Sequence, residues 1–91
     1  MYLSVTKVKP LILHHLLLIF ENNEEKIFNL NPYLNLGKFQ ELKNEKLFNT
    51  VKISFDTIEW DNKLDLDPET LYSEAYNKSE ERNKVTYPKS N

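Results

Sequence analysis

The sequence contains no cysteine, one glycine and one arginine among its 91 residues. The absence of cysteine excludes disulfide frameworks, thiolate zinc sites and thiol nucleophiles. The one glycine, Gly37, cannot build a dinucleotide fingerprint or a phosphate-binding P-loop, because each needs two or more glycines at fixed spacing. The one arginine, Arg82, stands against eleven lysines, which disfavours base-specific reading of DNA or RNA by bidentate guanidinium groups.

A chain of this length has room for one small domain and little room for a deep active-site cavity. We expect residues 1–76 to form that domain and residues 77–91 to form a polar C-terminal tail. The most apolar run, residues 11–20, is about half as long as a membrane span, contains two histidines and is followed by no cleavage site. We therefore expect a cytoplasmic protein without a membrane segment.

The spacing of apolar residues predicts an α+β domain. Five segments have strand patterns: residues 2–9, 11–20, 26–30, 51–55 and 57–60. Pro10 separates the first two, and the second is apolar on both faces, as in a central strand. Residues 38–49 predict a short central helical segment, and Asp67 before Pro68 predicts the start of a C-terminal helix. The order of these strands and helices along the chain favours a small, mostly antiparallel sheet of about five strands.

Aromatic residues recur at the apolar positions of these elements, and we expect five of them in the core or at its edge: Phe28, Phe39, Phe48, Phe55 and Trp60. In the polar turn after residue 20, Asn22 or Asn23 is expected to take a left-handed conformation.

His14 and His15 are the only histidines and the first candidates for catalysis or metal binding. Adjacent residues on a strand point to opposite faces, so two such imidazoles cannot close on one ion. We expect one ring to face solvent and the other to lie at a core position with its nitrogens hydrogen-bonded. The sequence places neither a nucleophile elbow nor a partner acid beside them, so we predict no catalytic residue.

Three aspartates, Asp61, Asp65 and Asp67, raise the possibility of a calcium loop. Such a loop needs glycine at its sixth position and glutamate at its twelfth, where this chain has Leu66 and Tyr72. We therefore expect no metal and no cofactor, and we interpret the chain as a protein that is not an enzyme. A small hydrolase that uses either histidine is kept as an alternative.

Acidic residues are concentrated in residues 56–76, where seven carboxylates against one lysine give a net charge of −6 in a chain of net charge −2. Such a segment repels phosphate and suits a basic protein partner. The alternative is that these acids only solvate loops and a helix terminus. We predict that the partner-binding residues are Glu59, Asp61, Asp65 and Tyr72.

A family resemblance is carried by Trp60 followed by Asp65-Leu66-Asp67-Pro68-Glu69-Thr70-Leu71-Tyr72, with Phe28-Asn29-Leu30-Asn31-Pro32-Tyr33-Leu34 upstream. Over about residues 3–76 the chain resembles the small bacterial domain of unknown function family 2442, which implies an α+β fold. Members usually place glycine in the first hairpin turn and after the tryptophan, where this chain has Asn23-Glu24 and Lys63. Both turns are expected to be wider or more strained here.

The resemblance also implies a function class. Some members carry a helix-turn-helix domain, and others look like the second partner of toxin–antitoxin-like gene pairs. About 15 residues after Tyr76 cannot hold a helix-turn-helix, which disfavours DNA reading in cis. We therefore expect a protein-interaction module, antitoxin-like or a regulatory accessory, whose partner is a co-encoded, toxin-like protein. The alternative is a nucleic-acid-binding accessory that uses Lys7, Lys9 and the basic residues of the tail, Lys78, Arg82, Lys84 and Lys89.

Overall fold

The computed structural model describes residues 2–79, which form two antiparallel sheets with short helices. Sheet A has the strand order β1-β2-β3-β7: Val5–Leu11, His15–Phe20, Glu25–Asn29 and Tyr76–Asn77. Sheet B has the order β4-β5-β6: Lys52–Ser54, Thr57–Glu59 and Asp65–Leu66. The helical elements are the 3-10 turns η1 (Ile12–His14), η2 (Asn31–Tyr33) and η3 (Gly37–Lys43) and the helices α1 (Glu45–Phe48) and α2 (Pro68–Glu74).

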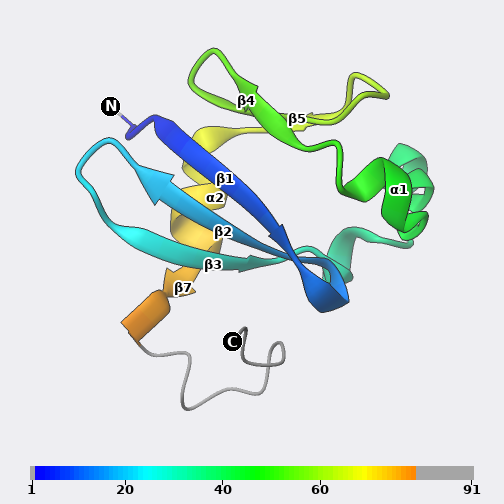
Figure 1. Cartoon of the computed structure of the whole chain (residues 1–91), viewed down its shortest axis with the longest axis horizontal. Helices are drawn as coiled ribbons and strands as arrows, with labels where there is room; N and C mark the ends of the chain where they lie inside the picture. The colour runs from blue at the N-terminus through cyan, green and yellow to red at the C-terminus, as the bar shows by residue number, and fades with distance from the viewer. Residues whose placement is uncertain (1, 80–91) are drawn as a thin grey trace.

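The predicted α+β class and antiparallel pairing are confirmed. The expected single sheet is instead divided in two, and β6 and β7 are additional strands of two residues each. A strand of two residues is too short to show an alternating pattern, so the spacing of apolar residues does not reveal such strands. In Figure 1, β1, β2 and β3 lie side by side, α2 lies behind them, and β4 and β5 lie above β1.

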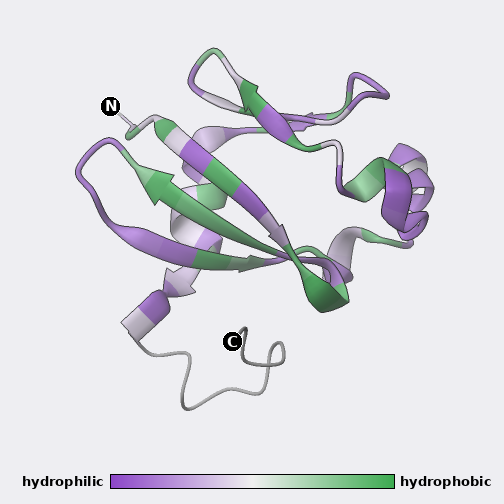
Figure 2. Ribbon diagram, in the orientation of Figure 1, coloured by the Kyte–Doolittle hydropathy of each residue, from purple (hydrophilic) through white to green (hydrophobic). Residues whose placement is uncertain are grey.

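The first hairpin differs from the prediction. β1 continues through Pro10, which pairs with Leu16, and the chain reverses at η1 rather than at the proline. β1 is an edge strand of sheet A, where a residue without an N–H is tolerated. The predicted strand over residues 11–20 is therefore wrong for residues 12–14, which form the turn, and correct for β2. Figure 2 shows β2 as a largely hydrophobic ribbon between the more mixed β1 and β3.

The C-terminal helix begins as predicted. The Asp67 side chain accepts a hydrogen bond from the backbone N–H of Thr70 at 3.2 Å, and Pro68 occupies the first turn. The helix is shorter than its apolar stripe suggested, because α2 ends at Glu74 and the chain returns to sheet A as β7. Asn77, assigned to the tail by the sequence, thus pairs with Lys26 of β3. Residues 80–91 of the predicted tail lie outside the described residues.

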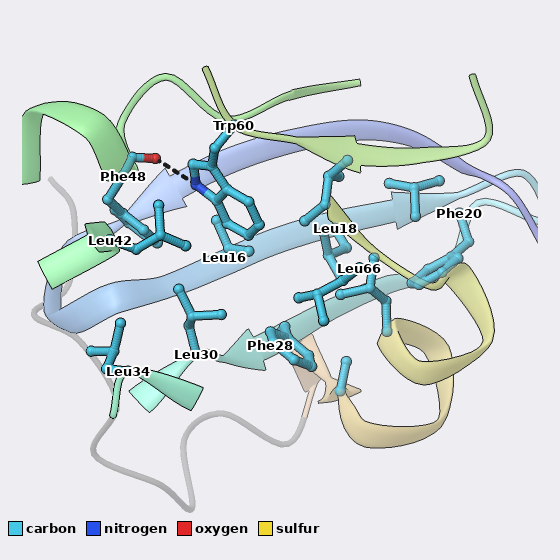
Figure 3. Packing of buried hydrophobic residues seen from close by; sticks show 14 residues of the cluster. Leu16, Leu18, Phe20, Phe28, Leu30, Leu34, Leu42, Phe48, Trp60 and Leu66 are labelled. Atoms are coloured by element: carbon cyan, nitrogen blue, oxygen red, sulfur yellow. Dashed lines mark hydrogen bonds between the residues drawn. The ribbon is translucent and has the colours of Figure 1, made fainter. Parts of the chain in front are cut away.

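One hydrophobic core lies between the inner face of sheet A, sheet B, α2 and η3 (Figure 3). Trp60, the residue after β5, is 0% exposed. Its indole Nε1 donates a hydrogen bond to the Phe48 carbonyl oxygen at 3.0 Å, which joins sheet B to α1. A buried indole N–H needs such a partner, and here the bond is made to the main chain. Trp60, Phe28 and Phe48 are core residues, as predicted.

The position of Trp60 predicts a large loss of stability for Trp60→Ala. Removing a fully buried indole deletes its transfer free energy and leaves a cavity, at a cost of about 3–5 kcal/mol. Because Trp60 is the only tryptophan, urea unfolding should be followed by circular dichroism. Trp60→Phe keeps a ring but loses the Nε1 donor, and should cost less than the alanine variant. A midpoint for Trp60→Ala close to that of the wild type would contradict this account of the core.

Candidate functional site

The acidic residues singled out from the sequence lie on the outer face of sheet B. Across β4, β5 and β6, Lys52 lies opposite Glu59 and Glu59 lies opposite Asp65, so the three side chains share one face. The neighbouring row, Ile53, Ile58 and Leu66, has the opposite orientation, and its last two members are buried in the core. The strand period of two therefore places the charged row outward.

Asp61 joins this row through Lys52. Its Oδ1 lies 3.5 Å from the Lys52 Nζ, and its backbone N–H donates to the Thr50 Oγ1 at 3.1 Å. We call Glu59, Asp61 and Asp65 the acidic cluster. Three carboxylates against one ammonium group leave a local charge of −2 on the outer face of sheet B.

The acidic cluster is not a stabilising network. The Lys52–Asp61 pair has side chains 57% and 58% exposed, and such surface pairs contribute about 0–1 kcal/mol. Glu59 and Asp65 lie directly opposite each other, and like charges in that position destabilise a strand pair. Lys52, opposite Glu59 on its other side, offsets part of this repulsion, and a positive group placed over the face would neutralise the negative charge that remains.

Tyr72 lies elsewhere. Its hydroxyl donates a hydrogen bond to the Glu24 carboxylate, its ring lies edge-on to Phe20, and the Lys26 Nζ is 4.2 Å from its ring centroid. The hydrogen bond raises the pKa of Tyr72 and lowers the pKa of Glu24. The structure thus brings Glu59, Asp61 and Asp65 together and places Tyr72 against the β2–β3 hairpin.

The two histidines hold the first turn. The His14 Nε2 lies 2.8 Å from the Leu42 carbonyl oxygen, and the His15 Nδ1 lies 2.8 Å from the Leu13 carbonyl oxygen. Leu13 and His14 have φ of 58° and 57°, so the premise of two neighbours on one straight strand is wrong. His15 is buried as one of the two was expected to be, while the half-buried His14 packs its ring against Phe48 rather than facing open solvent. Burial lowers the pKa of His15.

Phe55 is the functional candidate that the sequence did not reveal. It was expected to pack in or beside the core, but it is 99% exposed at the turn between β4 and β5. The turn falls on Phe55 and Asp56, one residue earlier than the predicted Asp56 and Thr57, because Ser54 already pairs with Thr57. A shift of one residue moves a side chain from the sheet face to the loop.

Another pair that the sequence did not indicate joins η2 to α2. The Tyr33 hydroxyl donates to a Glu74 carboxylate oxygen at 2.6 Å. Burial, together with this acceptor, raises the pKa of Tyr33 to about 12. The contact joins residues 41 positions apart, and no local pattern reports such a pair.

Residues 2–79 bear on the expectations about metal ions and membrane segments. Within that part of the chain, no three histidine or acidic side chains gather in a way that could hold a metal ion. Over the same residues, every helix is too short or too polar to span a bilayer. Of the three aspartates considered for calcium, Asp61 pairs with Lys52 and Asp67 caps α2.

The family model described as Protein of unknown function (DUF2442) matches residues 5–77, from the start of β1 to the end of β7. The chain belongs to this family. The matched span contains both sheets, the acidic cluster and Phe55. No curated protein and no solved structure matches the chain.

Two turns of this DUF2442 domain have the strain expected where glycine is replaced. Asn23 has φ of 70° and Lys63 has φ of 71°, both in the left-handed region that glycine enters without steric cost. The left-handed conformation predicted for Asn22 or Asn23 is thus at Asn23. Asparagine tolerates this region better than lysine does, so Lys63 carries the larger cost.

Lys63→Gly should therefore stabilise the domain. Glycine relieves the left-handed strain, and its greater freedom in the unfolded chain offsets part of the gain, which leaves about 0.5–1 kcal/mol. Thermal unfolding should show a higher melting temperature. The matched control is Lys46→Gly, an exposed lysine inside α1, which should lower the melting temperature. Destabilisation by both variants would contradict the strain at Lys63.

The lowered pKa of His15 predicts a pH-dependent stability. The unfolded chain, with an ordinary histidine pKa of about 6.5, binds more protons than the folded domain as the pH falls below neutrality. The contribution of uncharged His15 to the free energy of unfolding is therefore complete above the unfolded-state pKa and decreases between pH 7 and pH 5. Urea unfolding should show that the wild type has a lower free energy of unfolding at pH 5 than at pH 7. The difference between the two pH values should be smaller in His15→Gln. An equal loss in His15→Gln would show that another group is responsible.

Proposed function

We propose that this DUF2442 domain is a cytoplasmic protein-interaction module, antitoxin-like or a regulatory accessory, that binds a basic surface of a partner protein through the acidic cluster. The observation that carries the proposal is the cross-strand pair of Glu59 and Asp65 on the outer face of sheet B. Lys52 offsets the repulsion within this pair only in part, and a lysine or arginine of a partner that approaches the two carboxylates would offset the rest.

A role without catalysis is proposed together with this binding role. The side chains most suited to acid–base chemistry, His14 and His15, both bond to main-chain carbonyl oxygens and support the η1 turn. The acidic cluster lies on an open sheet face, where water screens each carboxylate, and carboxylates there suit attraction over a distance better than proton transfer. The module would act on its partner by binding to and covering part of the partner's surface.

Sheet B also favours recognition because its geometry is fixed before binding. The Asp61 backbone is held by Thr50, and the turn after Trp60 is closed by a hydrogen bond from the Lys63 N–H to the Trp60 carbonyl oxygen at 2.9 Å. Strands that already present their carboxylates lose little conformational freedom when a partner binds. The expected contribution of the charges is to the association rate and to the choice of partner.

The test uses the full chain and the protein recovered with it from its native cells, identified and purified separately. Glu59→Gln/Asp65→Asn should lower the association rate constant at low salt by about 3- to 10-fold and reduce its salt dependence, because long-range attraction is lost. Stopped-flow mixing at two salt concentrations measures both quantities. The matched control, Glu25→Gln/Glu45→Gln, removes two exposed charges from β3 and α1 and should leave the rate constant unchanged.

Two outcomes would overturn the proposal. One is an association rate that the acidic-cluster variant does not alter. The other is binding of nucleic acid by the wild type with a steep salt slope, which would favour the accessory role through Lys7 and Lys9.

A further inference from the structure

The β4–β5 turn presents an aromatic side chain entirely to solvent. Phe55 is 99% exposed, whereas Phe20, Phe28 and Phe48 are almost completely buried. A phenylalanine that packs against nothing in its own domain gains nothing from burial. Isolated exposed apolar residues are common on proteins, so exposure alone would not distinguish Phe55. What distinguishes Phe55 is its backbone conformation and its surroundings.

The backbone at Phe55 is strained. Phe55 is the first residue of a two-residue hairpin loop and has φ of 57°. Hairpin loops of this length prefer glycine, asparagine or aspartate at such positions, because a side chain with a Cβ is crowded there. Neither local conformation nor packing accounts for phenylalanine in this turn. Residues held in sparsely populated conformations cluster at binding and catalytic sites.

The turn is nevertheless held firmly in place. The Asp56 carbonyl oxygen accepts a hydrogen bond from the Val5 N–H at 3.0 Å, and the Asp56 carboxylate accepts one from the Tyr2 hydroxyl. Both contacts tie the loop to the start of the chain, and Figure 1 shows the N-terminal end beside the β4–β5 loop. A ring presented on a tethered loop loses little freedom on binding, which is the property of a good interface anchor.

The surroundings of the turn are negative. The carboxylates of Asp56, Asp67 and Glu21 all act on the Tyr2 hydroxyl and raise its pKa, with Asp56 making the largest contribution. Glu59 follows Phe55 by four residues on the same hairpin, which is about 13 Å along a strand. Phe55 and the acidic cluster thus fit within one interface of ordinary size.

From these observations we infer that Phe55 is the apolar anchor of the interaction module and enters an apolar pocket of the partner protein whose rim carries lysine or arginine. The inference rests on the proposed function and adds to it the residue that supplies affinity. The acidic cluster steers the partner, and Phe55 slows its dissociation. Burial of the ring by the partner offsets the strain that the turn carries in the free domain.

The first experiment places the photo-crosslinker benzoylphenylalanine at position 55 of the full chain in its native cells. Irradiation should join the chain to the partner protein, and the joined peptide should contain apolar residues flanked by lysine or arginine. The matched control position is Leu13, which is 56% exposed and has φ of 58° at the opposite hairpin turn. Absence of a crosslink from position 55, or equal crosslinking from both positions, would overturn the inference.

The second experiment measures the dissociation constant for the purified partner by calorimetry. Phe55→Ala should weaken binding by about 30-fold or more, mainly through faster dissociation, and Leu13→Ala should leave binding unchanged. Phe55→Gly should weaken binding equally while raising the melting temperature of the free domain, because it relieves the turn. A structural role for Phe55 predicts the opposite shift in melting temperature.

The outcomes separate this inference from the proposed function. If Glu59→Gln/Asp65→Asn slows association but Phe55→Ala leaves the dissociation constant unchanged, the module binds its partner without Phe55 and the inference fails alone. If neither variant alters binding, both fail. Sedimentation that shows a dimer of the wild type and a monomer of Phe55→Ala would assign the ring to a second copy of the chain and would also overturn the inference.

Discussion

Burial of Trp60 is the interaction on which the rest of this domain depends. Its indole fills the space between the two sheets, and its Nε1 bonds to the Phe48 carbonyl oxygen. Because side chains alternate along a strand, an inward Ile58 and an inward Trp60 require Glu59, which lies between them, to point outward. The burial of Trp60 therefore turns Glu59 outward, and on β6 the burial of Leu66 turns Asp65 to the same outer face.

The turns are the second constraint, because several of them hold side-chain-bearing residues in the left-handed region. Leu13 and His14 are kept there by bonds from the turn to other elements: Leu42 accepts from His14, and the Leu13 carbonyl oxygen accepts from His15 and Asn31. Strained backbone persists only where surrounding contacts determine it. The histidines thus stabilise the turn through hydrogen bonds, which explains why they lie at the end of a hairpin rather than in a cavity.

Much of the fold could be predicted from local patterns, and the errors have a common cause. Asp67 before Pro68 marks a helix start, and Trp60 marks the core, since both signals depend on residues near in sequence. The pairing of β7 with β3 depends on contacts between residues about 50 apart, which periodicity does not report. For the candidate site, charge predicted the acidic residues, but the face shared by Glu59 and Asp65 required strand register.

The exposure of Phe55 illustrates how register decides which side chains a domain this small presents to solvent. If the β4–β5 loop began one residue later, Phe55 would lie on a sheet face and the hairpin would be an ordinary edge of the fold. With the loop at Phe55 and Asp56, the same hairpin carries an exposed aromatic ring at its tip and carboxylates along its outer face. An apolar centre beside a charged surface is the composition of protein-binding sites, because burial supplies affinity while charge selects the partner. Sheet A and α2 hold most of the core, which leaves the short sheet B free to present both features.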